Sequence, residues 1–170
     1  LIFTSLFSFA QGGEDNTPYL MENRVIRTCS GIVYDSGGFN GNYSNDENIT
    51  MTICPDVDGA FVRLDFTTFL LENNADFLRI FDGIGTGGQE IGIDPFTGTN
   101  SPGTVSALIG EGATGCLTLV FTSDDNNTAP GFSARITCAP PCQIMVPRIV
   151  QTSPDANPAL GKVCDEDYGT

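Results

Sequence analysis

The chain has 170 residues, and its 21 acidic and 7 basic side chains give a net charge of −14. Such an acidic chain is a poor match for nucleic acid or for an anionic membrane surface, because both ligands require clustered cations. Histidine is absent, which removes the Ser-His-Asp and Cys-His catalytic arrangements, the usual zinc sites and the commonest general base. We therefore expect no enzyme in this chain by itself.

The first eleven residues form an apolar run of the length typical of the hydrophobic region of a secretory signal peptide. Small residues at Ser8 and Ala10 predict cleavage after Ala10 or Gln11. We interpret residues 1–11 as the remnant of such a peptide; the alternative is a buried N-terminal strand. The run is too short to span a bilayer, and we expect no membrane insertion. Export would place the protein in the extracellular space or on the outer cell surface.

Six cysteines follow the expected export signal. An even number in an exported chain favours disulfides over metal binding or catalysis. Sequence alone leaves the pairing open, and we predict the sequential one, Cys29–Cys54, Cys116–Cys138 and Cys142–Cys164. Each bridge would close a loop of about 25 residues and stabilise the fold by roughly 3 kcal/mol in the loop-entropy picture.

After a polar N-terminal segment at 12–24, the sequence contains short segments in which apolar and polar residues alternate. Alternation of apolar and polar residues is typical of strands with one buried face, and it predicts strands at 25–29, 49–54, 60–71, 76–81, 105–109, 116–121 and 131–138. Segment 116–121 is the most apolar, so we expect it at the centre of a sheet. The spacers are rich in turn-forming residues, and no segment has helical periodicity. The pattern predicts a β-sandwich or a β-barrel.

Two further segments are less regular. The glycine-rich run at 83–88 could suggest a phosphate-binding loop, but it lacks the Gly-Lys-Ser/Thr ending and opens no helix. We predict a glycine-rich hairpin turn there. Ala139, Pro140 and Pro141 form a stiff boundary. We interpret residues 140–170 as a linker and the beginning of a second, incomplete β-domain.

Four short motifs along residues 29–138 occur in an order that is typical of a known family. They are Cys29 with 31–34 (Gly-Ile-Val-Tyr) and 41–44 (Gly-Asn-Tyr-Ser), 64–69 (Leu-Asp-Phe-Thr-Thr-Phe) before Glu72, 76–83 (Asp-Phe-Leu-Arg-Ile-Phe-Asp-Gly), and 119–124 (Leu-Val-Phe-Thr-Ser-Asp) leading to Gly131 and Phe132. In this order they resemble a CUB domain. The resemblance implies an all-β, antiparallel jelly-roll sandwich, which we place at residues 25–139.

The chain also departs from the CUB pattern. The frequent third cysteine before Asp76 is missing, a common tryptophan is replaced by Met51, and the family's Tyr-Pro prolines are absent. We expect Cys116–Cys138 to replace the second disulfide of the family. The variant is similar to CUB-like modules in large surface proteins of Bacteroidetes-type bacteria.

Many CUB domains bind calcium at one end of the sandwich. The resemblance implies a ligand set here of Tyr43, Glu72, Asp76 and Asp124, completed by Asn126 or Asn127. Calcium takes about six to eight oxygen ligands, and three carboxylates brought together without a cation would repel one another. The alternative is that the three acids are separately solvated. In the family such a site orders loops that engage a basic side chain, which implies a partner lysine held by Glu72 and Asp124.

Three functions are compatible with these observations. The first is an extracellular, calcium-binding recognition or adhesion module at the N-terminus of a larger secreted or cell-surface protein, with a protein or glycan ligand. The second is a non-catalytic accessory domain of a secreted protease or glycosidase whose catalytic domain lies beyond Thr170. The third is a structural spacer. Fold does not decide among them, and the oligomeric state stays open.

Overall fold

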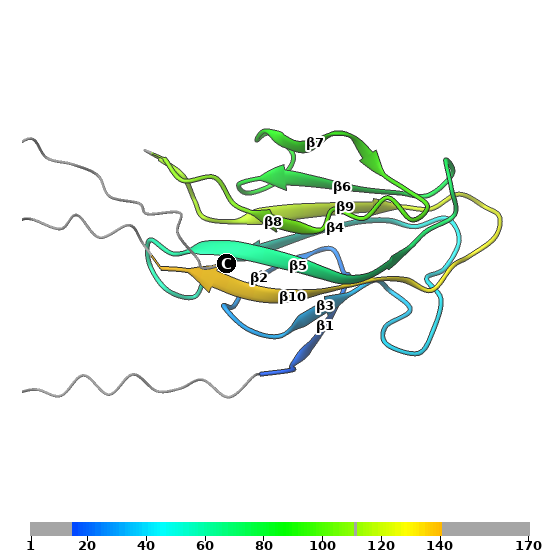
Figure 1. Cartoon of the computed structure of the whole chain (residues 1–170), viewed down its shortest axis with the longest axis horizontal. Coiled ribbons are helices and arrows are strands. Elements are labelled where there is room, and N and C mark those ends of the chain that lie inside the picture. The colour runs from blue at the N-terminus through cyan, green and yellow to red at the C-terminus, as the bar shows by residue number, and fades with distance from the viewer. Residues whose placement is uncertain (1–14, 111, 141–170) are drawn as a thin grey trace, which may run out of the picture.

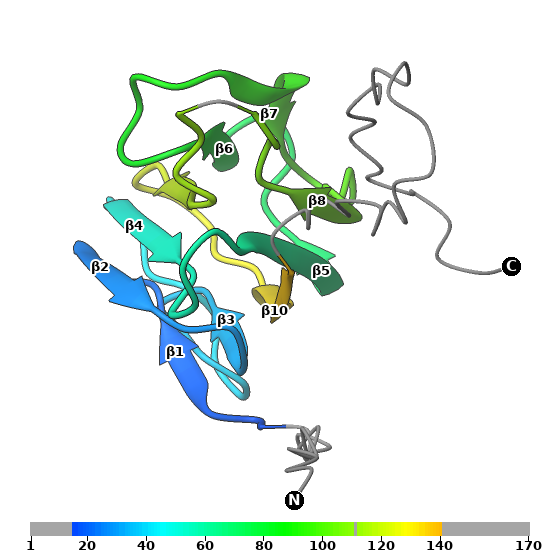
Figure 2. The ribbon, with the colours of Figure 1, turned by 90° about the vertical axis from the view of Figure 1, so that its left-hand side faces the viewer.

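The computed structural model describes residues 15–110 and 112–140, and in these residues all regular structure is β-strand. Two five-stranded sheets have the strand orders β1-β3-β10-β5-β8 and β2-β4-β9-β6-β7, and Figure 2 shows them as two facing layers. The predicted all-β sandwich is therefore confirmed. The strands are β1 (Pro18–Leu20), β2 (Arg24–Arg27), β3 (Ile32–Tyr34), β4 (Asn48–Cys54), β5 (Phe61–Leu70), β6 (Phe77–Asp82), β7 (Glu90–Phe96), β8 (Thr104–Ser106), β9 (Leu117–Thr122) and β10 (Gly131–Ala139).

The core forms because alternating side chains point to opposite faces of a strand. In β5, Val62, Leu64 and Phe66 are buried while Arg63 and Asp65 between them are exposed. Strand β9 is the most completely buried of the set and lies third of five in its sheet, as its apolar sequence predicted. Inward-facing side chains of both sheets join in one hydrophobic cluster.

Strand direction differs from the prediction at two sheet edges. Most neighbours pair antiparallel, but β1 pairs parallel with β3 and β2 pairs parallel with β4. The chain passes from the first sheet to the second and back between β1 and β3, and such a crossover, unlike a hairpin, allows parallel neighbours.

Three strands were not predicted, namely β1, β3 and β7. The first two have three residues each, which is too short for alternation to be visible. Strand β7 contains Gly92 and Pro95, which weaken the strand pattern in the sequence. It lies at a sheet edge, where the missing amide of proline is tolerated. Because β1 is hydrogen-bonded to β3, the sandwich already includes residues 18–20, which were expected to precede it.

The glycine-rich run forms the predicted hairpin turn, since β6 and β7 pair antiparallel on either side of it. Gly83 and Gly85 have φ values of 90° and 73°, a region that favours glycine because it lacks a Cβ atom.

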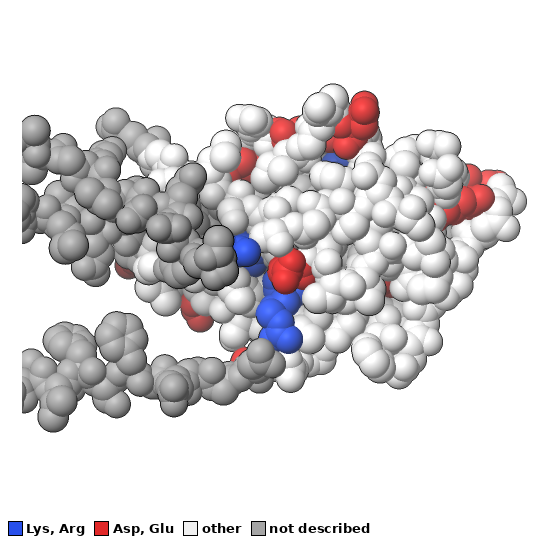
Figure 3. Space-filling view, in the orientation of Figure 1, with Lys and Arg blue, Asp and Glu red and all other residues white. Residues whose placement is uncertain are grey.

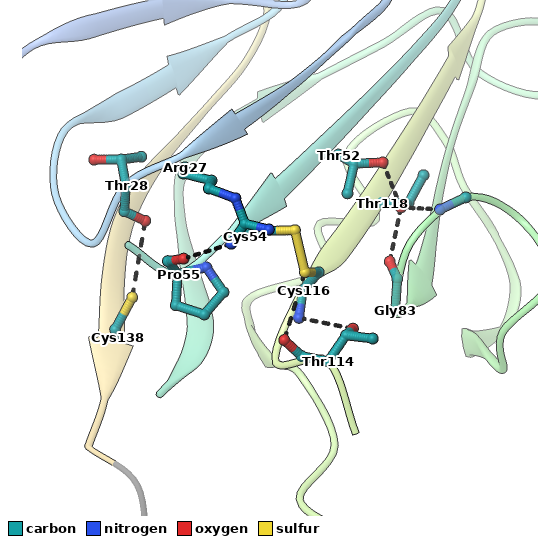
Figure 4. The surroundings of a disulfide bond; sticks show 11 residues. Arg27, Thr28, Thr52, Cys54, Pro55, Gly83, Thr114, Cys116, Thr118 and Cys138 are labelled. Carbon is teal, nitrogen blue, oxygen red and sulfur yellow. Dashed lines mark hydrogen bonds between the residues drawn. A yellow bond between two sulfur atoms is a disulfide. The ribbon is translucent and has the colours of Figure 1, made fainter. Parts of the chain in front are cut away.

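The disulfides correct the sequential pairing. The observed bridges are Cys29–Cys138 and Cys54–Cys116, so the predicted Cys29–Cys54 and Cys116–Cys138 are wrong. Cys54 ends β4 and Cys116 directly precedes β9, and these two strands are hydrogen-bonded neighbours. Sheet neighbourhood rather than sequence proximity therefore decides the partner, as Figure 4 shows around Cys54 and Cys116.

Several predictions fall on residues outside the described ranges. They concern the signal-peptide remnant at 1–11, the second β-domain beyond residue 140 and the Cys142–Cys164 bridge. Within the described ranges, no helix is long and apolar enough to cross a membrane.

Candidate metal centre

Three loops that are distant in sequence meet at one end of the sandwich, at the right of Figure 1. They are residues 35–47 between β3 and β4, 71–76 between β5 and β6, and 123–130 between β9 and β10. The first and third are joined directly. The amide of Asp46 donates to the carbonyl of Asp124 at 2.7 Å, and the hydroxyl of Ser123 donates to the carbonyl of Ser44 at 2.7 Å.

The structure brings three of the predicted ligands together on two of these loops. Glu72, Asp76 and Asp124 each place a carboxylate oxygen so that all three oxygens lie within 4.8 Å of one another. Asp76 is 0% exposed, Glu72 is half-buried and Asp124 is exposed. The cluster is therefore deep at Asp76 and open to solvent at Asp124.

The buried carboxylate of Asp76 is held by neutral groups. The hydroxyl of Tyr43 donates to one oxygen, and the amide of Asp124 donates to the other at 2.9 Å. Burying a carboxylate is costly unless its charge is compensated. Two neutral donors satisfy its hydrogen-bonding needs but bring no positive charge.

Tyr43 ties two of the loops together. Its hydroxyl donates to Asp76 and accepts the amide of Glu72 at 2.9 Å, and its ring packs edge-on against Phe121 at 5.0 Å. Burial, and then the hydrogen bond to Asp76, raise the pKa of Tyr43 far above its ordinary value. The hydroxyl stays protonated at neutral pH, so it can donate its hydrogen bond to Asp76.

Glu72 has one carboxylate oxygen without a partner. Its Oε1 accepts the side-chain amide of Asn127 at 2.8 Å, whereas Oε2 is buried and has no hydrogen-bond partner among the described residues. Such an orphaned acceptor costs about 1–3 kcal/mol, and more when it is charged. The hydroxyl of Thr97 donates to the carbonyl of Glu72 at 3.0 Å and holds the loop in place.

The two candidate asparagines are placed differently. Asn127, with φ 41°, is bonded directly to Glu72 of the cluster. Asn126 donates its backbone amide to Asp124 at 2.9 Å, but its side chain donates to Asp125 at 2.6 Å. Of the two, only Asn127 directs its side chain at a member of the carboxylate cluster.

These residues fit a calcium ion. Every donor atom in the cluster is oxygen, the choice of hard cations such as Ca²⁺ rather than of zinc. A cation bound at the cluster would satisfy the buried carboxylate oxygen of Glu72 that has no hydrogen-bond partner among the described residues.

Sequence reasoning missed a second pair of acids, at the base of loop 35–47. Asp35 is 1% exposed and accepts the amides of Gly37 and Phe132, each at 2.8 Å, and burial raises the pKa of its carboxyl. Glu47 accepts the hydroxyl of Ser36, and its other oxygen is buried without a partner among the described residues. In the sequence both look like ordinary loop acids, because only the folded loop buries Asp35 and one oxygen of Glu47.

Known proteins resemble this chain in structure rather than in sequence. No sequence-family model matches it, and no curated protein sequence does. The CUB1-EGF-CUB2 region of human MASP-1/3 matches with a TM-score of 0.56 at 20% identity, over 70% of this chain and 43% of that one. The full extracellular region of zebrafish Gpr126/Adgrg6 matches with a TM-score of 0.55 at 19% identity, over 69% of this chain and 15% of that one.

One solved structure of an isolated domain is matched by this chain over almost the whole length of that domain. The MASP-1 CUB2 domain, in a crystal structure with bound Ca²⁺, has a TM-score of 0.54 at 20% identity, over 68% of this chain and 98% of that one. The chain thus spans less than half of the two larger structures but nearly all of the isolated domain. Together with the motif order, this likeness shows that the described part of the chain has the fold of a CUB domain.

Proposed function

We propose that this chain is an extracellular recognition module, within a larger secreted or cell-surface protein, whose end loops are ordered by calcium. The observation that carries the proposal is the carboxylate cluster, in which Asp76 is buried among neutral partners and Glu72 has an orphaned oxygen. One solved structure with this fold, the MASP-1 CUB2 domain, is bound to Ca²⁺. The expected similarity to bacterial surface proteins stays a prediction.

Each predicted ligand except Asn126, whose side chain donates to Asp125, has a role in this proposal. Glu72, Asp76 and Asp124 supply carboxylate oxygens, and Asn127 completes the shell from loop 123–130. Tyr43 acts as a positioning residue that holds Asp76, because its hydroxyl is engaged by protein groups. A bound calcium ion would offset the repulsion among the carboxylates and thereby join loops 71–76 and 123–130.

The exposed rim of the cluster defines the expected partner. Asp124 is open to solvent, and Glu72 next to it is half-buried. A lysine of a protein ligand, placed at this rim, would pair with both carboxylates. Modest affinity at one such site is typical of modules that gain avidity from multiple copies.

Thermal unfolding of the full, oxidised chain in calcium and in EDTA tests the proposal. Extracellular calcium modules bind at about 10⁻⁴–10⁻³ M, so about 10 mM calcium should stabilise the fold by roughly 1.4–2.7 kcal/mol. For a domain of this size the melting temperature should rise by roughly 5–10 °C.

Two variants make the test specific. Asp124→Ala should lose the calcium-dependent rise, whereas Asp94→Ala, an equal charge change at an exposed position of β7, should keep it. If the wild-type curves with calcium and with EDTA coincide, the calcium site is wrong, and the spacer interpretation gains support.

A further inference from the structure

An uncharged groove of about 360 Å³ lies on the outer face of β3, β10 and β5. Tyr34, Phe39 and Leu70 are exposed or half-buried apolar residues that line it, and none of its lining residues is charged. Phe39 is 81% exposed and Leu70 is 42% exposed, and the ring of Tyr34 meets that of Phe39 edge-on at 6.3 Å. We call this feature the apolar groove.

The apolar groove and the candidate metal centre are built from the same three stretches of chain. Phe39 lies in loop 35–47 with Tyr43, Leu70 lies two residues before Glu72, and Pro130 lies in loop 123–130 with Asn127. Two residues of chain span at most about 7 Å, so Leu70 of the groove lies close to Glu72 of the acidic cluster. In Figure 3 the surface at the right of β5 and β10 is mostly uncharged up to the acidic atoms at that end.

The floor of the groove favours an apolar side chain over a sugar. The hydroxyls of Thr67 and Thr68 are hydrogen-bonded to the hydroxyl of Ser133, at 2.9 and 2.8 Å. These mutual hydrogen bonds leave fewer donors and lone pairs on the three hydroxyls for the hydroxyl groups of a carbohydrate. Exposed aromatic and aliphatic side chains gain most from contact with another apolar group.

We propose that the apolar groove and the acidic rim form one binding site for a protein segment that carries a lysine and, a few residues away, a large apolar side chain. The proposal rests on the proposed function, since the lysine would bind at Glu72 and Asp124. Charge complementarity selects this ligand: the acidic rim attracts a cation, and the uncharged groove accepts an apolar anchor. An apolar anchor beside a charged contact is a common basis of protein recognition.

Two matched sets of synthetic peptides test this proposal on the full, isotope-labelled chain in calcium. In the first set, acetylated and amidated, a lysine is followed after one to four glycines by phenylalanine; in the second, alanine replaces the phenylalanine. NMR titration should show that the best phenylalanine peptide binds about five- to tenfold more tightly than its alanine counterpart. Its shifts should include the amides of Phe39 and Leu70.

Matched protein variants locate the effect. Phe39→Ala should abolish the preference for phenylalanine, while Ile93→Ala should retain it, because Ile93 is 101% exposed on the edge strand β7 of the other sheet. Both positions are exposed, so neither change should affect folding appreciably.

The outcomes separate this inference from the proposed function. Equal binding of both peptide sets, or binding by neither, refutes the shared site, whereas the calcium-dependent melting of the same sample reports on the metal centre without any peptide. Shifts of Phe39 and Leu70 induced by chitotriose but by no peptide would also overturn the proposal and assign the groove to carbohydrate.

Discussion

Replacing Tyr43 with phenylalanine removes a single hydroxyl that serves two loops. That hydroxyl donates to the fully buried Asp76 and accepts the amide of Glu72 at 2.9 Å. The ring would remain packed on Phe121, so the change creates almost no cavity. What it leaves is a buried carboxylate oxygen without its donor and a backbone amide without its acceptor.

The expected cost follows from these two losses. A hydrogen bond to a charged group contributes roughly 1.5–3 kcal/mol, and an unsatisfied buried amide costs roughly 1–3 kcal/mol. The two terms share one hydroxyl and are not simply additive. We therefore expect Tyr43→Phe to lower the free energy of unfolding by about 3 kcal/mol, which corresponds to a fall in melting temperature of roughly 10–15 °C.

Thermal unfolding in EDTA measures this effect without any contribution from calcium. Tyr34→Phe is the matched control, because the Tyr34 hydroxyl has no hydrogen-bond partner in the described part of the chain. If Tyr43→Phe melts within about 2 °C of Tyr34→Phe, the hydroxyl does not hold the loops together. The assignment of Tyr43 as a positioning residue would then be refuted.

Two further predictions concern alkaline pH and a glycine. Folding raises the pKa of Tyr43 above its ordinary value of 10.0, so the folded state binds the hydroxyl proton more tightly than the unfolded state does. The resulting contribution to the free energy of unfolding is complete below about pH 10 and is lost as the pH rises towards the folded-state pKa. The melting temperature should therefore fall as the pH rises above about 10, with a shallower slope in Tyr43→Phe; equal slopes in both proteins would contradict the linkage. Gly131→Ala would place a Cβ atom 2.1 Å from the buried Asp35 Oδ2 at φ 77°, whereas Gly103→Ala, at φ 67°, meets nothing within 4 Å. In urea unfolding we expect a loss of at least about 3 kcal/mol for the first change and about 1 kcal/mol for the second; similar losses would show that the contact with Asp35 is unimportant.

The sequence by itself determined those features that are written in local patterns. Alternation in 60–71 and 116–121 predicted β5 and the central β9, because successive side chains of a strand face opposite ways. The glycine run predicted a hairpin for a steric reason that acts within a few residues. The order of the motifs pointed to the CUB fold and to Glu72, Asp76 and Asp124 as neighbours.

Only the tertiary structure decided relations between distant segments. Cys54 bonds Cys116 because β4 lies beside β9, a neighbourhood that sequence spacing does not reveal. Asp76 and Asp124 are the same residue type, yet one is fully buried and the other is exposed.

The parts of the site that were missed have the same origin. Three features arise where the three loops meet. They are the double role of Tyr43, the buried Asp35 with the half-buried Glu47 beside it, and the apolar groove at Phe39. Local patterns report which face of a strand is apolar, but burial and partner choice depend on how two sheets pack. Sheet packing depends on contacts between residues far apart along the chain, so these features became visible only in three dimensions.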